Sequence, residues 1–477
     1  MSQKKFYLTT PIFYPNAKLH LGHAYTTTVS DVLVRYHRLV GDKTYFLTGS
    51  DENAQKMVEA ARKEGKEPLQ FLDEIVAKFE ALFKELEISY DQFIRTTDKE
   101  KHWPGAQKLW QQLAEAGDIY KKEYEGLYCV GHEAFVTEKE LVDGKCPDHG
   151  TVPERIKEEN YFFRLSKYSE EIKRKIESDE LRIVPATRKK EILSFIEQGL
   201  EDVSFSRPRR LDWPEGLGVP VPGEETHVMY VWCDALANYI TALGYGRDDT
   251  LYKEFWPGVH VIGKDILRFH AAIWPGMLLS AKLPLPTTLL VHGFITSGGK
   301  KMSKTLGNVI DPEELIAEYG KDAVRYYLAR HISPFEDGDI TRESFKEIYN
   351  GDLANGLGNL VARIMQLAET HLEGPVKVEF VPYPHEFTEA FEKFEINRAA
   401  DYVWHRIQLL DRTITETEPY KVVKTNADEG KRIIADLVRE LAAIDLLLEP
   451  FMPETSKKII EAIMANKKPE NLFARKE

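Results

Sequence analysis

In the first fifty residues, apolar side chains recur with two different spacings along the chain. Residues 5–10 and 44–48 mix aromatic and β-branched side chains in the manner of short strands. Between them, a stretch without Gly or Pro runs from about His23 to Leu39, and four of its apolar residues recur at helical spacing, namely Val29, Val32, Leu33 and Tyr36. These patterns predict a strand, a helix and a second strand, a unit whose ligands bind beyond the carboxyl ends of its strands.

The same two periodicities organise the rest of the chain. Helical spacing continues through 68–88, and further strands are predicted at 259–262 and 289–291 with a helix between them. Strands that alternate with helices predict a parallel sheet. From Tyr349 onward the pattern is nearly all helical, and one apolar stripe consists of Ile433, Leu437, Leu441, Ile444 and Leu448. Such a stripe is typical of a helix bundle.

Length and charge narrow the class of protein. A chain of 477 residues is too long for one compact core, so two to four domains are expected. The 64 Lys and Arg residues against 77 Asp and Glu residues give a net charge of −13, which excludes a bulk polyanion binder. Any nucleic-acid contact must use a local basic patch, and the candidates are 188–190, 207–210 and 300–304, each of which could also be a solvated face.

Cysteine usage and hydropathy bear on the compartment. Three cysteines are too few for a disulfide framework, which indicates a reducing environment. No apolar signal core or membrane-spanning stretch is present. We therefore expect a cytoplasmic protein without membrane contact; a mature organellar form, from which a transit peptide has been removed, would have the same features.

A short motif, His20-Leu21-Gly22-His23, lies in the loop between the first strand and its helix. The start of a helix offers unpaired N–H groups and a positive dipole end, which favour an anion. Gly22 leaves room for a nucleotide, and both histidines can donate to phosphate oxygens. Taken alone, the motif is equally compatible with two ordinary loop histidines.

A second motif, Lys300-Lys301-Met302-Ser303-Lys304, follows Gly298-Gly299. Lys301 and Lys304 are three residues apart, and their ammonium groups suit phosphates whose charge shifts during a reaction. By itself the segment could be a solvated basic turn. Together, the two motifs resemble those of the class I aminoacyl-tRNA synthetases.

Two pairs of possible metal ligands follow, Cys129-x-x-His132 and Cys146-x-x-His149, with thirteen residues between them. Thiolates and imidazoles in two such pairs fit a tetrahedral zinc knuckle. The alternative is two buried thiols and two surface histidines. Methionyl enzymes of the resembling class can carry a zinc knuckle here, inside a domain inserted between the halves of the nucleotide fold. Their second ligand is commonly Cys, whereas this chain has His132.

The resemblance narrows to the methionyl branch, with the best matches in 6–56, 228–239, 263–275 and 292–308. It implies that the carboxylate of Asp51 meets the substrate ammonium. It also implies a thioether pocket, in which aromatic rings suit sulfur, formed by Ile12, Tyr14, Trp232, Leu236, Tyr239, Ile266, Phe269 and His270. Leu236 stands where the family often has Pro. The short insertion leaves little room for the editing domain found in the enzymes for isoleucine, valine and leucine.

Further roles come from the same resemblance. ATP would be bound by His20, Gly22, His23, Gly263, Asp265, Lys301 and Lys304, and Arg207 would assist at the phosphates. The anticodon would be read by Asn359, Arg363 and Tyr420. A spacing of four places the first two on one helix face, and Tyr420, where the family usually has Trp, can stack on a splayed base.

The expected fold class is α/β: a Rossmann-like parallel-sheet catalytic domain, split by an inserted zinc-knuckle domain and followed by an α-helical anticodon-binding bundle. The expected boundaries are 1–117 and 227–300 for the two halves of the catalytic domain, 118–226 for the insertion, 301–348 for the lysine motif with a stem-contact module, and 349–477 for the bundle.

The implied reaction activates methionine with ATP and Mg²⁺ to methionyl-adenylate, then transfers it to the 3′ end of tRNA(Met), including the initiator. Three alternatives stay open: a class I synthetase for cysteine or a branched aliphatic residue, a small-molecule nucleotidyltransferase, and a non-catalytic tRNA-binding paralogue. The intact motif residues argue against the last. The resemblance also bears on the oligomeric state, because many members of the family add a C-terminal tRNA-binding domain that dimerises them and this sequence stops right after its bundle. We therefore expect a monomer, with which a separate tRNA-binding protein could associate.

Overall fold

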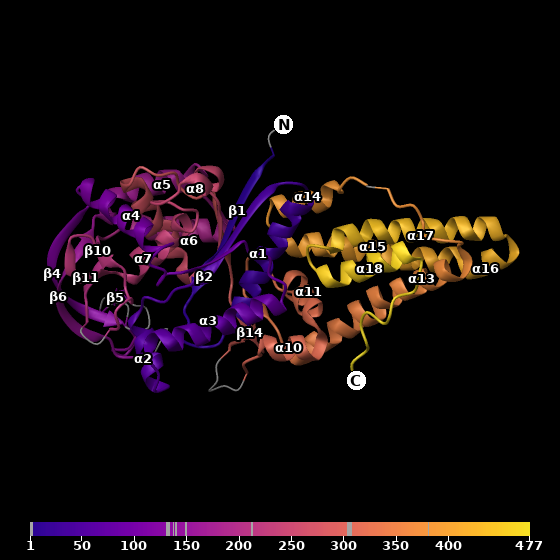
Figure 1. Ribbon diagram of the computed structural model, residues 1–477, viewed down its shortest axis with the longest axis horizontal. Helices are drawn as coiled ribbons and strands as arrows, with labels where there is room; N and C mark the ends of the chain where they lie inside the picture. The colour runs from indigo at the N-terminus through magenta and orange to yellow at the C-terminus, as the bar shows by residue number, and fades with distance from the viewer. Residues whose placement is uncertain are drawn as a thin grey trace. The chain divides into compact units, whose positions relative to one another are not determined.

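The computed structural model describes residues 3–129, 134–136, 138, 141–147, 150–210, 213–302, 308–379 and 381–477, without the side chains of 124, 134, 135 and 301. The chain forms two compact units (Figure 1). The sheet unit comprises Met1–Leu19, Asp42–Leu82 and Ser89–Val291, and the helical unit comprises His20–Gly41, Phe83–Ile88 and His292–Glu477. No helix within these described stretches is long and apolar enough to cross a membrane.

A six-stranded sheet forms the centre of the sheet unit, in the order β3-β2-β1-β12-β13-β7. Its strands are β1 (Lys5–Phe13), β2 (Lys43–Ser50), β3 (Gln92–Arg95), β7 (Arg182–Val184), β12 (Val259–Gly263) and β13 (Thr288–His292). β1 pairs in parallel with β2 on one side and with β12 on the other. The chain moves outward in opposite directions from β1, so the crevice at the carboxyl ends of β1 and β12 is the natural ligand site of such a sheet.

The insertion between the halves of this sheet carries two smaller sheets. One has the order β5-β4-β6-β8, from Ala134–Val136, Ile119–Cys129, Glu154–Phe163 and Val203–Ser204. β4 and β6 pair antiparallel from Ile119 opposite Phe163 to Tyr128 opposite Glu154. The other has the order β10-β11-β9, from Pro220–Val221, Glu224–Met229 and Ser206–Pro208. The last of these strands, β11, leads directly into α7 (Val231–Thr241).

The helices of the sheet unit connect its strands along the chain. They are α2 (Gln55–Lys63), α3 (Pro68–Glu85, whose last turn belongs to the helical unit), α4 (Trp103–Glu115), α5 (Ser169–Glu177), α6 (Ala186–Glu197), α7 (Val231–Thr241), α8 (Thr250–Phe255) and α9 (Trp274–Ser280). Short 3₁₀ or π turns are η2 (Leu165–Tyr168), η3 (Lys264–Ile266) and η4 (Phe269–Ile273). α4 packs against α7, and η3 and η4 follow directly after β12.

The helical unit contains α1 and the C-terminal helices. They are α1 (Leu21–Leu39), α10 (Pro312–Tyr319), α11 (Lys321–His331), α12 (Arg342–Ile348), η6 (Tyr349–Gly358), α13 (Asn359–His371), α14 (His385–Glu392), α15 (Ile396–Thr417), α16 (Pro419–Thr425), α17 (Ala427–Leu448) and α18 (Pro453–Ala465). A small sheet joins β14 (Ile295–Ser297) to β15 (Lys300–Lys301) and β16 (Gly338–Asp339). Figure 1 shows α13, α15, α17 and α18 lying together as a bundle.

The predicted α/β class with a parallel sheet and a helical C-terminal region is confirmed. The predicted apolar stripe lies on α17, where Leu437, Leu441, Ile444 and Leu448 are buried and Ile433 is half-buried. One boundary was wrong: the first helix begins at Leu21 and not near His23, because His20 caps its N-terminus. The histidine motif therefore forms the first turn of α1 and not a loop.

Gly105 offers a test of the packing of α4 on α7. A Cβ at this position would lie 2.4 Å from the carbonyl oxygen of Tyr245 and 2.6 Å from Cγ2 of Thr241. We expect Gly105→Ala to destabilise the protein by about 1–3 kcal/mol through overpacking, measured as a lower melting temperature. Gly351→Ala is the control, since its Cβ would meet no atom within 4 Å. Equal melting temperatures for the two variants would contradict this close approach.

Candidate functional site

An aromatic pair lies at the start of α7 in the sheet unit. The rings of Trp232 on α7 and Phe269 on η4 are stacked, with centroids 3.8 Å apart and planes 10° apart. The ring of His270 meets Trp232 edge-on at 6.1 Å. Trp232 and Phe269 are half-buried against the core of the unit. A partly open aromatic surface beside a packed core is typical of a small-molecule pocket.

His270 is held in one protonation state by two bonds. Its Nδ1 lies 2.9 Å from the carbonyl oxygen of Ile266, which can only accept, so Nδ1 carries the proton. Its Nε2 therefore accepts from the hydroxyl of Tyr239, 2.7 Å away. Burial lowers the pKa of His270 to about 4 and raises the pKa of Tyr239. Both side chains are neutral near pH 7, so this wall is polar without charge.

Asp51 lies directly after β2 and is 2% exposed. Its N–H donates to the carbonyl of Phe13 at the end of β1, over 2.9 Å. The next residue, Glu52, is fully buried and accepts from Nε of Arg95 at 2.7 Å and from the hydroxyl of Ser50 at 2.5 Å. These bonds fix the backbone on both sides of the Asp51 carboxylate.

A second buried network ties this segment to α7. Asp234 is fully buried on α7 and accepts from Nδ2 of Asn53 at 2.6 Å and from Nε2 of His102 at 2.5 Å. Nδ1 of His102 lies 2.8 Å from the hydroxyl of Thr241, and Oδ1 of Asn53 accepts from the N–H of Gly218 at 2.8 Å. Sequence reasoning missed Asn53, His102 and Asp234. The one signal was that Asp234 is the single charged residue of a mostly apolar helix.

The other predicted site residues of the sheet unit lie at strand ends, in η3 or on α7. Ile12 pairs with Gly49 where β1 runs beside β2, and Tyr14 follows with Nζ of Lys56 3.1 Å from its ring centre. Gly263 ends β12, and the exposed Asp265 lies in η3. Leu236 and Tyr239 are buried on α7, and Ile266 is half-buried. The ends of β1, β2 and β12 thus supply residues to the expected crevice.

Arg207 in β9 lies beside the start of α7. Its Nη1 donates to the hydroxyl of Ser204 at 2.7 Å and to the carbonyl of Ser206 at 3.0 Å. Its guanidinium carbon is 5.0 Å from the ring centre of Tyr230, the residue before α7. The arginine is therefore held at the return of the insertion.

In the helical unit, the two motif histidines cap α1. Nδ1 of His20 accepts from the N–H of Gly22, and the N–H of His20 donates to Nδ1 of His23, both at 3.1 Å. Burial and the nearby His20 lower the pKa of His23 well below its usual value. With both Nδ1 atoms accepting, the ring protons are on Nε2, which is the atom that can donate to an anion.

The local structure of the helix start also requires glycine at position 22. A Cβ at this position would lie 2.9 Å from Cε1 of His20, so any larger residue would push the capping imidazole away. The glycine and the two histidines therefore depend on one another.

The lysine motif begins in a hairpin. Gly298 and Gly299, with φ of +61° and +69°, form the turn between β14 and β15, and Lys301 pairs with Thr296. Oδ1 of Asp339 accepts from the N–H of Gly299 at 2.8 Å. The side chain of Lys301 and the whole of Lys304 lie outside the described residues.

The three anticodon candidates lie on two helices of the helical unit. Asn359 begins α13 and is exposed, and Arg363 follows on the same helix with Nη1 2.5 Å from Oδ1 of Asp411. Tyr420 lies on α16, is 42% exposed and donates to Glu418 at 3.1 Å.

Of the four predicted zinc ligands, the structure describes Cys129 and Cys146, and both are buried. Cys129 ends β4. The carbonyl of Cys146 accepts from the N–H of Gly150 at 2.7 Å. His132 and His149 lie outside the described residues, and within those residues no three ligand side chains are gathered around a possible metal position.

Comparison with known proteins agrees with this architecture. Residues 6–152 and 149–365 match the family described as class I tRNA synthetases (M). The methionine–tRNA ligase of Clostridium acetobutylicum is 46% identical over 478 residues, which cover 96% of this chain and 73% of that protein. The enzyme of the same name from Bacillus subtilis is 42% identical, with coverage of 96% and 73%.

A solved structure shows the same fold. Mycobacterium tuberculosis methionyl-tRNA synthetase in complex with methionyl-adenylate superposes with a TM-score of 0.89 at 36% identity, covering 96% of this chain and 94% of that one. The chain therefore belongs to the methionyl-tRNA synthetases, within the class I tRNA synthetase family.

Proposed function

We propose that this chain is a methionine–tRNA ligase that activates methionine with ATP and transfers it to the 3′ end of tRNA(Met), including the initiator. The observation that carries this proposal is the neutral aromatic wall of Trp232, Phe269, His270 and Tyr239 in the unit that also buries Asp51. An uncharged, polarisable wall suits a thioether, and a carboxylate suits the substrate ammonium.

In the first step, an oxygen of the methionine carboxylate attacks the α-phosphorus of ATP in line. The new O–P bond forms as the bond to the bridging oxygen breaks, and pyrophosphate leaves. Asp51 holds the ammonium, and Ile12, Tyr14, Leu236 and Ile266 complete the proposed pocket. No enzyme nucleophile is needed, so positioning and charge stabilisation supply the rate.

The phosphates are the proposed partners of the two motifs. His20 and His23 donate from Nε2, Lys301 and Lys304 contribute positive charge, and Arg207 assists. Gly263 and Asp265 bind the adenosine, with Gly22 leaving room. Mg²⁺, which enters with ATP as part of the substrate, would neutralise phosphate charge.

In the second step, a terminal ribose hydroxyl of tRNA attacks the carbonyl carbon of the adenylate, and AMP leaves. We assign anticodon reading to Asn359, Arg363 and Tyr420 in the domain 349–477. The other proposed domains are the two halves of the catalytic domain at 1–117 and 227–300, the insertion at 118–226, and the lysine motif with its stem-contact module at 301–348. The monomeric state and the cytoplasmic location stay predictions.

Amino-acid-dependent exchange between pyrophosphate and ATP, measured without tRNA over the twenty amino acids, tests this function. We expect exchange with methionine alone, because the pocket wall carries no charge and its rings favour sulfur. Exchange with cysteine or a branched aliphatic amino acid would support adenylate formation but contradict the assignment of the pocket to methionine. No exchange with any amino acid, with or without tRNA, would overturn the proposal.

We propose a structural zinc ion in the insertion, held by Cys129, His132, Cys146 and His149. Two buried thiols, one of which ends a strand, fit a knuckle, and zinc would hold the two segments together without taking part in the reaction.

The zinc proposal is tested by metal analysis of the purified chain. We expect about one zinc per chain, lost in Cys146→Ala because a thiolate ligand is removed. Cys233→Ala is the matched control, since Cys233 is also buried but lies on α7. A wild-type chain without zinc, or a Cys146→Ala variant that retains it, would contradict the site.

The protonation of His270 predicts a pH-dependent stability. Its pKa is about 4 in the folded protein and about 6.5 when unfolded, so the unfolded chain binds the additional proton between these values. The contribution of the neutral His270 to the free energy of unfolding is therefore fully present above about pH 6.5. It is lost as the pH drops toward 4, by up to about 3 kcal/mol.

We expect His270→Gln to reduce this acid loss in urea unfolding between pH 7 and pH 4.5. The loss should not vanish, because burial also lowers the pKa of His260. His405→Gln, at an exposed position, is the control. An acid loss that is the same in wild type and His270→Gln would show that His270 is not buried in its neutral form.

A further inference from the structure

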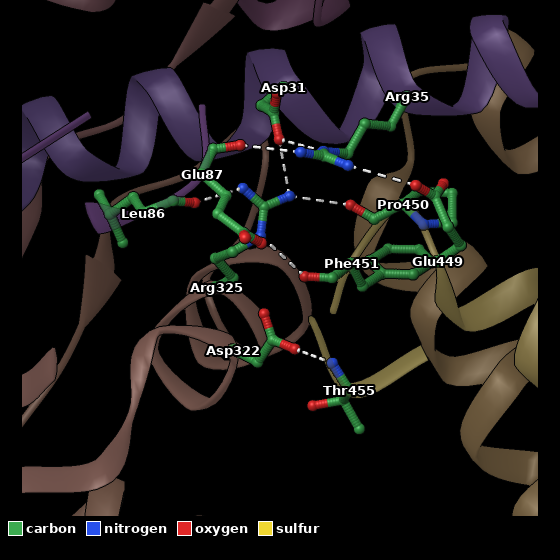
Figure 2. Close-up of polar contacts among 10 residues, drawn as sticks. All are labelled: Asp31, Arg35, Leu86, Glu87, Asp322, Arg325, Glu449, Pro450, Phe451 and Thr455. Carbon is green, nitrogen blue, oxygen red and sulfur yellow. Dashed lines mark hydrogen bonds and ion pairs between the residues drawn. The ribbon is translucent and has the colours of Figure 1, made fainter. Parts of the chain in front are cut away.

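Four charged side chains form a cluster inside the helical unit, and we name Asp31, Arg35, Arg325 and Glu449 the α1 ion cluster (Figure 2). Asp31 and Arg325 are fully buried. Oδ2 of Asp31 lies 2.7 Å from Nη2 of Arg325 and 2.7 Å from Nε of Arg35. Nη1 of Arg35 lies 3.2 Å from Oε1 of Glu449. Two positive and two negative groups are thus balanced.

The guanidinium of Arg325 also binds three backbone carbonyls. Nη1 donates to Leu86 at 3.0 Å, Nη2 to Pro450 at 3.0 Å and Nε to Phe451 at 3.1 Å. Figure 2 shows these bonds converging on one side chain from α11. The planar fork of arginine, and not the point charge of lysine, matches several acceptors held at fixed angles.

Arg35 lies one turn after Asp31 on α1, and its guanidinium also binds both carboxylates and a backbone carbonyl. Its Nη2 donates to the carbonyl of Glu87 at 2.8 Å while its other nitrogens bind Asp31 and Glu449. The cluster therefore fastens α1 to three other segments of the same unit, namely α11, residues 83–88 and the connection between α17 and α18.

α1 has a second attachment nearer its N-terminus. The hydroxyl of Thr26 lies 2.9 Å from Nε2 of His292, and the hydroxyl of Tyr25 donates to the carbonyl of Ser333 at 2.8 Å. The attachment near the N-terminus alone leaves the helix able to tilt, and its direction is defined by the cluster together with the stacking of Tyr36 on Phe391 further along α1. Of these constraints, the cluster is the one made by buried charged groups.

The direction of α1 decides where its capping histidines lie. At 1.5 Å per residue, Asp31 lies about 7.5 Å from Thr26 on one side and His20 about 9 Å on the other. A shift of about 1 Å at Asp31, with Thr26 as the pivot, therefore moves His20 by about 1 Å, a misplacement that can cost a reaction up to about 100-fold.

We propose that Arg325, together with Asp31 and Glu449, positions His20 and His23 for the phosphates of ATP by fixing the direction of α1. This inference rests on the proposed function, since it takes the histidines to act in adenylate formation. Net stability alone does not account for the cluster, because apolar residues of similar size often replace a buried ion group without loss. The residues act through α1 and are positioning residues.

Three variants test the inference in methionine-dependent pyrophosphate exchange, with active sites counted by the burst of adenylate formed. Arg325→Lys keeps a charge beside Asp31 but loses the fork to the three carbonyls. Glu449→Gln is a milder change, because Glu449 is 34% exposed and its loss leaves Arg35 paired with Asp31. Glu440→Gln is the matched control: Glu440 is 38% exposed on α17 and pairs with Arg406 inside the bundle.

We expect Arg325→Lys to lower kcat per active site about 10-fold and Glu449→Gln about 3-fold, each with a raised KM for ATP. The KM for methionine should stay unchanged in both, because the proposed methionine residues belong to the sheet unit. Glu440→Gln should match wild type. If Arg325→Lys does not fold, Glu449→Gln decides the question.

Lower melting temperatures with wild-type kcat per site would overturn the inference in favour of a structural role. So would an equal rise in the KM for methionine, or an equal loss in Glu440→Gln. A wild-type chain without methionine-dependent exchange would instead overturn the proposed function, which separates the two failures.

Discussion

A charge removed from water must be paired, and this constraint decides how the residues proposed for function are held. In the sheet unit, Asp234 is buried on α7 and is paired only because Asn53 and His102 reach it from other segments. In the helical unit, Asp31 is buried on α1 and has Arg325 and Arg35 as partners. Each carboxylate joins a helix that carries proposed site residues to segments distant in the chain.

The two networks differ in what they determine. Asp234 is two residues from Trp232, and its partner Asn53 is two residues from Asp51, so this network relates the aromatic wall to the carboxylate. The α1 ion cluster lies in the middle of its helix, and its effect reaches the histidines through the rigidity of α1. Buried polar groups of this kind are costly when incomplete, and here each one has several bonds.

The proposed pocket wall follows an opposite principle, because its buried polar groups are uncharged. The bonds of His270 to Tyr239 and Ile266 satisfy both ring nitrogens without an ion. Burial then keeps the imidazole neutral, which suits the uncharged side chain of the proposed substrate, methionine. The charged residues proposed for function are those that would contact the substrate ammonium and the phosphates. A chain with a negative net charge could therefore still bind ATP through a few positively charged side chains at the proposed site.

The sequence by itself determined the strands and helices of the first nucleotide-fold unit, the parallel sheet, the helical C-terminal region and the identity of the motifs, but not the antiparallel sheets of the insertion. Buried runs such as Val259–Gly263 and the stripe on α17 are local periodicities, which neighbouring residues alone express. Only the tertiary structure decided that His20 caps α1, that His270 is neutral, and that Asn53, His102 and Asp234 meet. The reason is physical: protonation and the pairing of buried charges depend on groups brought together from distant parts of the chain, such as Asp31, Leu86, Arg325 and Phe451, and no local pattern encodes that meeting.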